Sequence, residues 1–203
     1  MTVYTALGDS ITAGYGVPSK FSFPALYADF LRRKCPALRL LNLGINGLTT
    51  KGLLTLLQSN QKLRLEVSRA SLITLTIGSN DLLQLIKKGQ PINPAQLPLL
   101  LNSFGCTFSQ IGEEIRCLNS SAAVKVATLY NPLPAGPYHC YSGAAQEILN
   151  QVNCIIVVWA NRFRAEIIDL DRVIRGKEQL LIGLDYAHPN AAGHQAIAKA
   201  FAR

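Results

Sequence analysis

The sequence predicts an α/β fold in which one doubly wound parallel sheet lies between two layers of helices. Short apolar runs alternate with longer amphipathic segments along the whole chain, and this alternation is typical of strands joined by helical crossovers. Turn-forming Gly, Asn, Pro or Asp residues bound the apolar runs. The 203 residues contain no repeat, low-complexity tract or linker, so we expect a single domain over residues 1–203.

Five apolar runs are expected to be strands. Each run is short and apolar, as a strand buried on both faces of a parallel sheet must be. The runs are Val3–Leu7, Leu38–Leu43, Ser71–Ile77, Val124–Tyr130 and Ala165–Leu170.

Six amphipathic segments are expected to be helices. In the fifth of them, apolar residues recur at helical spacing and predict a stripe that faces the core: Ile148, Val152, Ile155 and Trp159. The segments are Phe23–Lys34, Thr49–Gln58, Asp81–Lys88, Pro94–Leu118, Ser142–Arg164 and Ala191–Ala202.

Two of these helices carry signals at their ends. Asn93 precedes Pro94 as a cap before a proline in the first turn, and Gln96 occupies the capping-box position. The segment Lys87-Lys88-Gly89 places basic side chains and a glycine at a helix C-terminus.

A net charge of +8 is compatible with binding to an anionic partner such as a nucleic acid or an anionic surface. The basic residues are scattered and form neither a stripe nor a known nucleic-acid module, so we expect a solvated basic surface and no nucleic-acid partner. No secretory leader and no apolar run long enough to span a bilayer is visible. We therefore expect a cytoplasmic protein without stable membrane insertion, although a form already processed for export would look the same. The oligomeric state is left open.

The cysteines indicate neither a disulfide framework nor a metal site, because they form no CxxC pair and no metal-ligand spacing. We expect reduced thiols, several of them buried as small apolar groups, and neither a cofactor nor a metal ion. The five cysteines are Cys35, Cys106, Cys117, Cys140 and Cys154.

Polar and glycine-rich segments follow four of the expected strands. Gly8-Asp9-Ser10 comes directly after the first, Gly44–Thr49 after the second and Gly78–Asp81 after the third. Asp185–Asn190 comes after the fifth, beyond a longer loop. Because ligands of such sheets bind outside the carboxyl ends of the strands, these segments should converge on one edge.

Three residues in these segments suit nucleophilic catalysis. A serine hydroxyl such as that of Ser10 attacks a carbonyl only when a base accepts its proton, and His188 is the candidate base. Asp185, three residues before His188, can orient the imidazole and stabilise its charged form. The other histidines, His139 and His194, are expected to have no catalytic role.

Attack on an ester carbonyl also creates an oxyanion, which needs hydrogen-bond donors already in place. The backbone N–H groups of Ser10 and Gly47 and the side-chain amide of Asn80 suit this role, and each donor is worth roughly 3 kcal/mol in the transition state. A glycine at position 47 lets the backbone approach the reacting centre without a side-chain clash.

Each of these residues also has an ordinary structural explanation. Ser10 and Asn80 could cap helices, and Gly47 could occupy a turn. Asp185 and His188 could form a salt bridge within a loop. The functional hypothesis therefore rests on the convergence of the set at one sheet edge.

Four sequence blocks resemble the motif blocks of the SGNH hydrolases, also called the GDSL esterase/lipase family, and they occur in the family's order. They extend from residue 4 to residue 190, and no functional position is substituted. The blocks are Tyr4–Gly14, Asn42–Thr50, Ile77–Asp81 and Asp185–Asn190.

This resemblance implies a role for each matching residue. Ser10 would be the nucleophile, and Asp185 and His188 would be the acid and the base. Asn80 and a glycine would join the Ser10 N–H in the oxyanion hole; the glycine is Gly47, and a shifted alignment would choose Gly44. Asp9 belongs to the signature but is not expected to be catalytic.

The resemblance further implies a flavodoxin-like, five-stranded, three-layer α/β/α sheet fold and a carboxylic ester hydrolase. We expect the enzyme to cleave esters of short to medium acyl chains, lysophospholipids or thioesters through an acyl-serine intermediate. The first alternative is a carbohydrate O-deacetylase of the same fold. More remote alternatives are a non-catalytic α/β module that binds a small ligand and a basic peripheral protein that binds anionic lipid or nucleic acid.

Four segments are expected to shape the substrate pocket, and none is long enough for a separate lid domain, so interfacial activation is not expected. The last of them is expected to border the acyl or alcohol site because this loop leaves the same sheet edge, and substitution of Tyr138 and Tyr141 would test this expectation. The segments are Gly14–Phe23, Gly47–Thr50, Asp81–Pro94 and Asn131–Tyr141.

Overall fold

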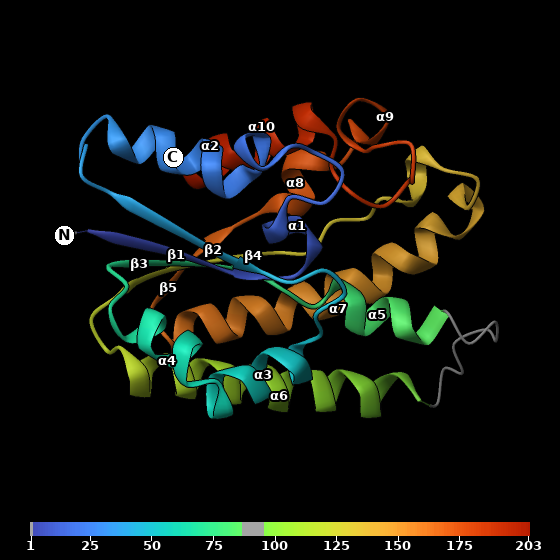
Figure 1. The fold of residues 1–203 in the computed structure, drawn as a ribbon. Helices are drawn as coiled ribbons and strands as arrows, with labels where there is room; N and C mark the ends of the chain where they lie inside the picture. Colours follow the sequence, from blue (N-terminus) through green and yellow to red (C-terminus); the bar gives the residue numbers. More distant parts are fainter. Residues whose placement is uncertain (1, 87–95) are drawn as a thin grey trace.

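The computed structural model describes residues 2–86 and 96–203. Five parallel strands form one sheet in the order β2-β1-β3-β4-β5, shown in Figure 1. This is the flavodoxin-like order, so the predicted fold class is confirmed. The strands are β1 Val3–Gly8, β2 Arg39–Gly44, β3 Leu72–Thr76, β4 Ala123–Ala127 and β5 Ala165–Ile168.

Strand β1 lies at the point where the strand order reverses. Its last residue, Gly8, pairs with Gly44 of β2 on one side and with Thr76 of β3 on the other. The chain therefore leaves all three strands at the same level of the sheet edge. Such a reversal point is where ligands bind in doubly wound sheets.

Helices cover both faces of the sheet (Figure 1). The layer on one face contains α2 (Phe23–Arg32), α8 (Leu170–Ile174) and α10 (Ala191–Phe201). The layer on the other face contains α3 (Thr50–Ser59), α4 (Gln61–Ser68), α6 (Leu97–Leu118) and α7 (Ser142–Arg162). The shorter elements are α1 Ser10–Ala13, α5 Ser79–Ile86, α9 Glu178–Leu181 and the 3₁₀ turns η1 Ser19–Phe21, η2 Leu133–Ala135 and η3 His139–Tyr141.

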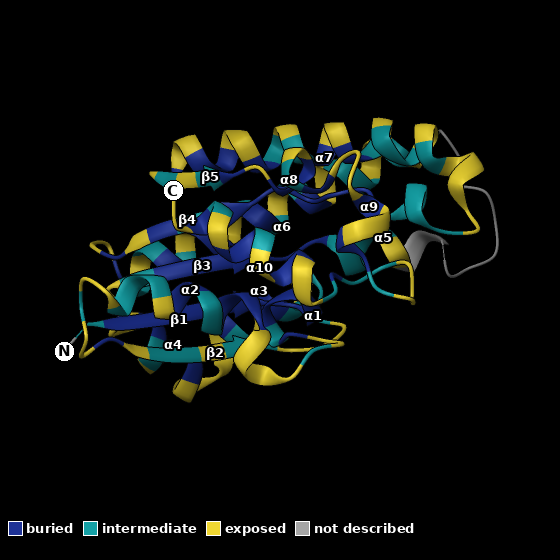
Figure 2. Cartoon of the chain, turned by 90° about the horizontal axis from the view of Figure 1, so that it is seen from above, coloured by how far each residue is buried: buried dark blue, intermediate teal, exposed yellow. Residues whose placement is uncertain are grey.

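Two apolar cores lie on the two faces of the sheet, because successive side chains of a strand point to opposite faces. Tyr4 and Ala6 of β1 pack in the core beneath α2 and α10, whereas Leu7 packs in the core beneath α3 and α6. Every residue of β1 is buried. Figure 2 shows the central strands dark blue and the edge strand β2 largely teal.

The strands differ from the sequence prediction in burial and length. Strands β2 and β5 are partly exposed, because they form the edges of the sheet. Strand β4 ends at Ala127, three residues before the predicted Tyr130. The Asn153 side chain explains this end: it accepts from the Leu129 N–H at 2.8 Å and donates to the Leu129 carbonyl at 2.9 Å.

The helices also differ from the prediction in detail. Helix α6 begins at Leu97, and Gln96 makes no capping hydrogen bond through its side chain. The predicted signals at Asn93-Pro94 and at Lys87-Lys88-Gly89 lie outside the described residues. Helix α7 is rotated from the predicted stripe: Ile148 and Ile155 are half-buried, and the buried residues are Leu149, Val152, Ile156, Trp159 and Ala160.

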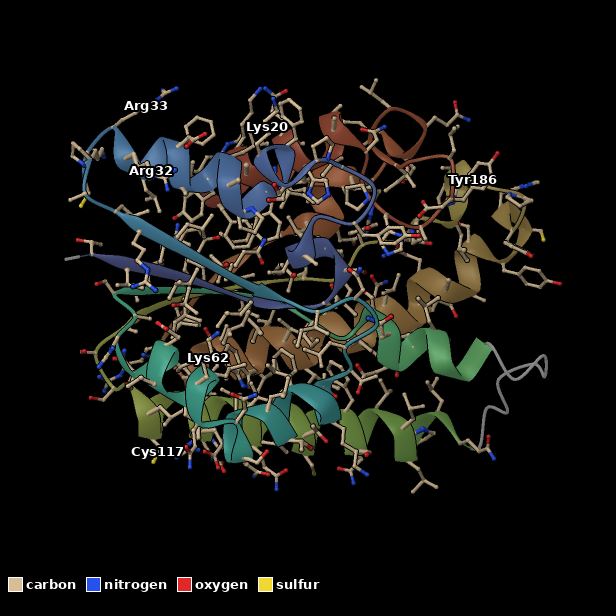
Figure 3. All side chains as sticks on the ribbon, viewed as in Figure 1. Lys20, Arg32, Arg33, Lys62, Cys117 and Tyr186 are labelled. Carbon is tan, nitrogen blue, oxygen red and sulfur yellow. The ribbon has the colours of Figure 1, made fainter. Side chains whose placement is uncertain are left out.

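The expectation that several cysteines are buried is wrong. Four of them are exposed and Cys35 is half-buried, because the helical cysteines fall on the outer sides of α6 and α7. Figure 3 shows Cys117 at the outer surface of α6. None of the described helices is long and apolar enough to cross a membrane.

Candidate active site

A chain of hydrogen bonds links a residue that follows β1 to two residues in the segment that follows β5. The Ser10 Oγ lies 2.9 Å from the His188 Nε2, and the His188 Nδ1 lies 2.6 Å from an Asp185 carboxylate oxygen. The structure thus brings together residues that are 178 positions apart in the sequence. With Nδ1–H donated to Asp185, Nε2 is free to accept the serine proton.

Hydrogen bonds within a tight turn fix the positions of Asp185 and His188 relative to each other. The second Asp185 oxygen accepts from the N–H groups of Ala187 at 3.1 Å and His188 at 3.0 Å, and the Gly183 N–H donates to the His188 carbonyl at 2.8 Å. Partial burial acts to raise the pKa of Asp185. The hydrogen bonds from His188 and Ala187 outweigh burial and lower the pKa, so the carboxylate stays charged beside the imidazole.

Ser10 is placed by the sharp exit of the chain from β1. Gly8 has a φ of +151°, and a Cβ there would lie 2.1 Å from the Thr76 carbonyl oxygen, so only glycine fits. Ser10 then begins α1, and the Asp9 side chain caps this helix by accepting from the Ile11 N–H at 3.0 Å. The serine is therefore the first residue of a helix, aimed beyond the sheet edge.

Asp9 is a buried carboxyl directly beneath the candidate nucleophile. Its Oδ2 has no hydrogen-bond partner among the described residues. Burial raises the pKa of Asp9 to about 7; the hydrogen bond from Ile11 opposes this rise, and the charge of Asp81 adds to it. Asp9 takes part in neither hydrogen bond of the Ser10–His188–Asp185 chain. The expectation that Asp9 is not catalytic stays a prediction.

The three expected oxyanion donors lie on neighbouring elements. The Asn80 side chain, on α5, donates to the Leu48 carbonyl at 2.9 Å, and its second amide hydrogen has no acceptor among the described residues. Neither the Ser10 N–H nor the Gly47 N–H donates to another described residue. The three groups therefore retain donor capacity that a bound oxyanion could use.

Gly44 and Gly47 are glycines for different reasons. Gly47 lies in the turn after β2 with a φ of +77° and open space around its Cβ position, so conformation alone requires glycine there. At Gly44, a Cβ would lie 2.2 Å from the Ala13 backbone nitrogen. Gly44 is therefore required for the contact between β2 and α1, and its N–H already donates to the Asn42 Oδ1 at 3.0 Å.

Two supporting contacts are not evident in the sequence. The Asp81 carboxylate accepts from the Thr50 N–H at 3.0 Å and from the Thr50 hydroxyl at 2.6 Å, and it ties the Gly47 turn to α5. Burial raises the pKa of Asp81, although these hydrogen bonds act against the rise. At the other side of the site, the buried Tyr130 hydroxyl donates to the Ala187 carbonyl at 2.8 Å and supports the His188 turn.

A cavity of about 130 Å³ opens beside Ser10 and His188. Its walls come from α1, α5, α7, the segment after β4 and the His188 turn, and they are mostly apolar. The apolar lining is Ile11, Leu82, Leu83, Tyr130, Pro132, Leu133, Ala145, Ile148, Leu149 and Ala187. Elsewhere in the described part of the chain, no three His, Cys, Asp or Glu side chains gather as a metal site requires.

The expected pocket segments contribute unequally. The loop after β4 does line the cavity, through Asn131, Pro132 and Leu133. Tyr138 and Tyr141, at the far end of this loop, are absent from the described lining and more than 60% exposed, so substituting them would not test the part of the loop that borders the cavity. They follow the η2 turn, which carries the chain away from the cavity toward solvent.

The GDSL-like lipase/acylhydrolase family has a sequence model that matches residues 6–196 of this chain. The chain belongs to this family. Membership makes the protein a carboxylic ester hydrolase and gives its candidate site a small-molecule ester as substrate class.

Relatives of this GDSL hydrolase extend over nearly its whole length. The spore germination lipase LipC of Bacillus licheniformis is 27% identical over 208 residues, which cover 97% of this chain and 92% of LipC. The uncharacterized protein YpmR of Bacillus subtilis is 26% identical over 215 residues, which cover 97% of this chain and 78% of YpmR.

Solved structures share the fold of this GDSL hydrolase. The lipase Lip_vut3 from a goat rumen metagenome has a TM-score of 0.86 at 24% identity and covers 99% of this chain and 96% of its own. An acetyl-xylooligosaccharide esterase mutant from Geobacillus has a TM-score of 0.72 at 18% identity, with coverage of 98% and 92%.

The two glycines should respond differently to alanine. Gly44→Ala forces a methyl group into the α1 backbone and should lower the free energy of unfolding by about 3 kcal/mol, whereas Gly47→Ala should cost about 1 kcal/mol of backbone strain. Per folded molecule, Gly47→Ala should be the variant that loses esterase kcat. Urea unfolding and active-site-normalised kinetics would measure both effects, and the reverse ranking in either would contradict this assignment.

Asp9→Asn should change the pH dependence of stability. The folded wild type keeps the Asp9 proton up to about pH 7, whereas the unfolded chain loses it near the ordinary pKa of 3.8. The Asp9 contribution to the free energy of unfolding therefore falls as pH rises from about 4 to about 7. Urea unfolding should show that the free energy of unfolding of the variant, relative to that of the wild type, rises by on the order of 2 kcal/mol between pH 5 and pH 8.

The comparison of the two proteins cancels other titrating groups. Burial lowers the pKa of His194 to about 4. The contribution of His194 to the free energy of unfolding therefore falls as the pH falls, and this change is the same in the variant and the wild type. A stability difference that stays constant from pH 5 to pH 8 would rule out the buried Asp9 charge as its source.

Proposed function

We propose that this enzyme cleaves carboxylic esters of short to medium acyl chains through an acyl-serine intermediate on Ser10. The observation that carries the proposal is the continuous hydrogen-bond chain from Ser10 through His188 to Asp185 at the mouth of an apolar cavity. A nucleophile, a base and an orienting carboxylate in contact are the components that acyl transfer requires.

In the first step, the Ser10 Oγ forms a bond to the ester carbonyl carbon while the His188 Nε2 takes the hydroxyl proton. The tetrahedral intermediate then collapses, the bond to the leaving alcohol breaks, and His188 returns the proton to the alcohol oxygen. In the second step, water attacks the acyl-serine with His188 again as base, and the acid and free Ser10 are released.

The carbonyl oxygen becomes negatively charged in both tetrahedral intermediates. The free amide hydrogen of Asn80 and the N–H groups of Ser10 and Gly47 are the donors proposed to hold it. Asn80 lines the cavity, and the contacts of Asn80 and Asp81 with the Gly47 turn fix the donors before substrate arrives. Such preorganised donors are commonly the largest electrostatic contribution to acyl transfer.

The cavity supports an aliphatic acyl group as the part of the substrate that it holds. A protein cavity of roughly 150 Å³ accommodates benzene, so a cavity of about 130 Å³ suits an acyl tail of about six carbons. Among the lining residues that the structure describes, His188 and the buried Tyr130 are the ionisable groups. An acetyl group, as on an acetylated saccharide, would leave much of this apolar volume empty.

Ser10→Ala should abolish both turnover and covalent labelling. We expect a fluorophosphonate probe to label the wild type and not the variant, and nitrophenyl butyrate hydrolysis to fall by about 10⁴-fold or more. Ser120→Ala, an exposed serine beyond the opposite sheet edge, is the matched control and should behave as wild type. An unlabelled wild type would contradict the acyl-serine mechanism and favour a non-catalytic module.

Acyl-chain preference should follow the volume of the cavity. Ala145, in the first turn of α7, lines the cavity, so Ala145→Phe should lower kcat/KM for hexanoyl and octanoyl nitrophenyl esters by about tenfold or more, with acetyl esters little affected. The adjacent Ala144 is exposed and absent from the lining, which makes Ala144→Phe the control. Equal effects of the two variants, or a wild-type preference for acetylated saccharides, would contradict the proposal that the cavity holds the acyl group.

A further inference from the structure

An exposed aromatic side chain lies against the candidate base. The ring centroids of Tyr15 and His188 are 4.4 Å apart, and their planes meet at 42°. Tyr15 is 48% exposed and belongs to neither apolar core. Core packing therefore does not account for its position, and no step of the proposed reaction yet uses it.

The backbone around Tyr15 is built to hold this ring in place. The Tyr15 N–H donates to the carbonyl of Ser10 at 2.9 Å, so the aromatic residue is tied to the helix that begins with the nucleophile. Gly14 and Gly16 on either side have φ values of +82° and +83°, which give the loop its two sharp bends. A Cβ at Gly14 would lie 2.5 Å from the Ser22 Cβ, so this bend also packs closely.

The far end of the loop is anchored to the segment that carries His188. The buried His194 side chain accepts from the Phe23 N–H through Nδ1 at 3.2 Å, where the loop enters α2. His194 lies on α10, a few residues after His188. The sequence assigned no function to this histidine, and the structure shows that it joins the Tyr15 loop to the histidine-bearing segment.

From this geometry we infer that Tyr15 is a positioning residue for His188, an inference that rests on the proposed acyl-serine mechanism. His188 becomes an imidazolium in the transition states of both steps. The face of an aromatic ring within about 6 Å attracts a cation, and the Tyr15 ring is near enough to do so. The ring also covers one side of the imidazole and restricts its rotation away from Ser10.

The contribution expected of an aromatic ring at a partly exposed site is about two- to fivefold in rate. It should appear in kcat, because the positive charge on His188 exists in the transition state and not in the bound ground state. The Tyr15 hydroxyl has no hydrogen-bond partner among the described residues, so the ring and not the hydroxyl is the active part.

The experiment compares Tyr15→Phe with Tyr15→Leu in steady-state hydrolysis of nitrophenyl butyrate, with rates divided by the concentration of fluorophosphonate-titratable sites. Tyr15→Phe should keep wild-type kcat. Tyr15→Leu, which fills similar space without an aromatic face, should lower kcat two- to fivefold with KM changed less than twofold. The matched control is Phe21→Leu, because Phe21 is 42% exposed on the same loop and contacts the Lys20 ammonium instead of a histidine.

The inference would be overturned by wild-type kcat in Tyr15→Leu, by equal losses in Tyr15→Phe and Tyr15→Leu, or by a change confined to KM. A loss of the same size in Phe21→Leu would also overturn it, because the effect would then belong to the loop as a whole. Failure of the proposed function is a separate outcome, seen as hydrolysis by Ser10→Ala or as a wild type that the probe does not label.

Discussion

The site depends on the parallel pairing of β1 with β2 on one side and β3 on the other. This pairing sets Gly8 level with Gly44 and Thr76, so the turns after three strands begin at one height. A shift of either neighbour would separate Ser10 from the donors expected to hold the oxyanion. Glycine at position 8 makes the close approach possible, because the Thr76 carbonyl occupies the place of a Cβ.

Several residues around the nucleophile lower the stability of the fold. Asp9 is buried with one oxygen unpartnered among the described residues, and burying an unsatisfied polar group costs about 1–3 kcal/mol. Asp81 is a half-buried carboxyl, held by Thr50. Tyr15 exposes an aromatic face to solvent. Each departs from what stability alone would select, and each lies within one or two contacts of Ser10, His188 or the Gly47 turn, as expected where function and stability compete.

Much of this arrangement could be predicted from the sequence. Apolar runs placed the strands, and the rule that ligands bind beyond the carboxyl ends of parallel strands placed Ser10, Asn80 and His188 at one edge. The motif resemblance already favours Gly47 over Gly44, but the packing reason for a glycine at position 44 could not be predicted, because it depends on the Ala13 backbone filling the Cβ position of Gly44. Periodicity cannot reveal a helix as short as α1, which spans four residues.

Contacts between distant segments could not be predicted. The Thr50–Asp81 and Tyr130–Ala187 hydrogen bonds join residues 31 and 57 positions apart, and nothing in either local sequence indicates its partner. The early end of β4 depends on the Asn153 side chain from α7. The exposure of Cys106, Cys117 and Cys154 could not be predicted from residue type, because burial depends on the face of the helix that a residue occupies.

The central claim is that Ser10 carries the acyl group during turnover. The most direct measurement is intact-protein mass spectrometry of enzyme mixed with excess nitrophenyl hexanoate and quenched in acid within the first turnovers, followed by peptide mapping. The account predicts one added hexanoyl group per chain, on the peptide that contains Ser10. Turnover with no adduct at any quench time, or an adduct on an exposed cysteine such as Cys140 instead of Ser10, would contradict it.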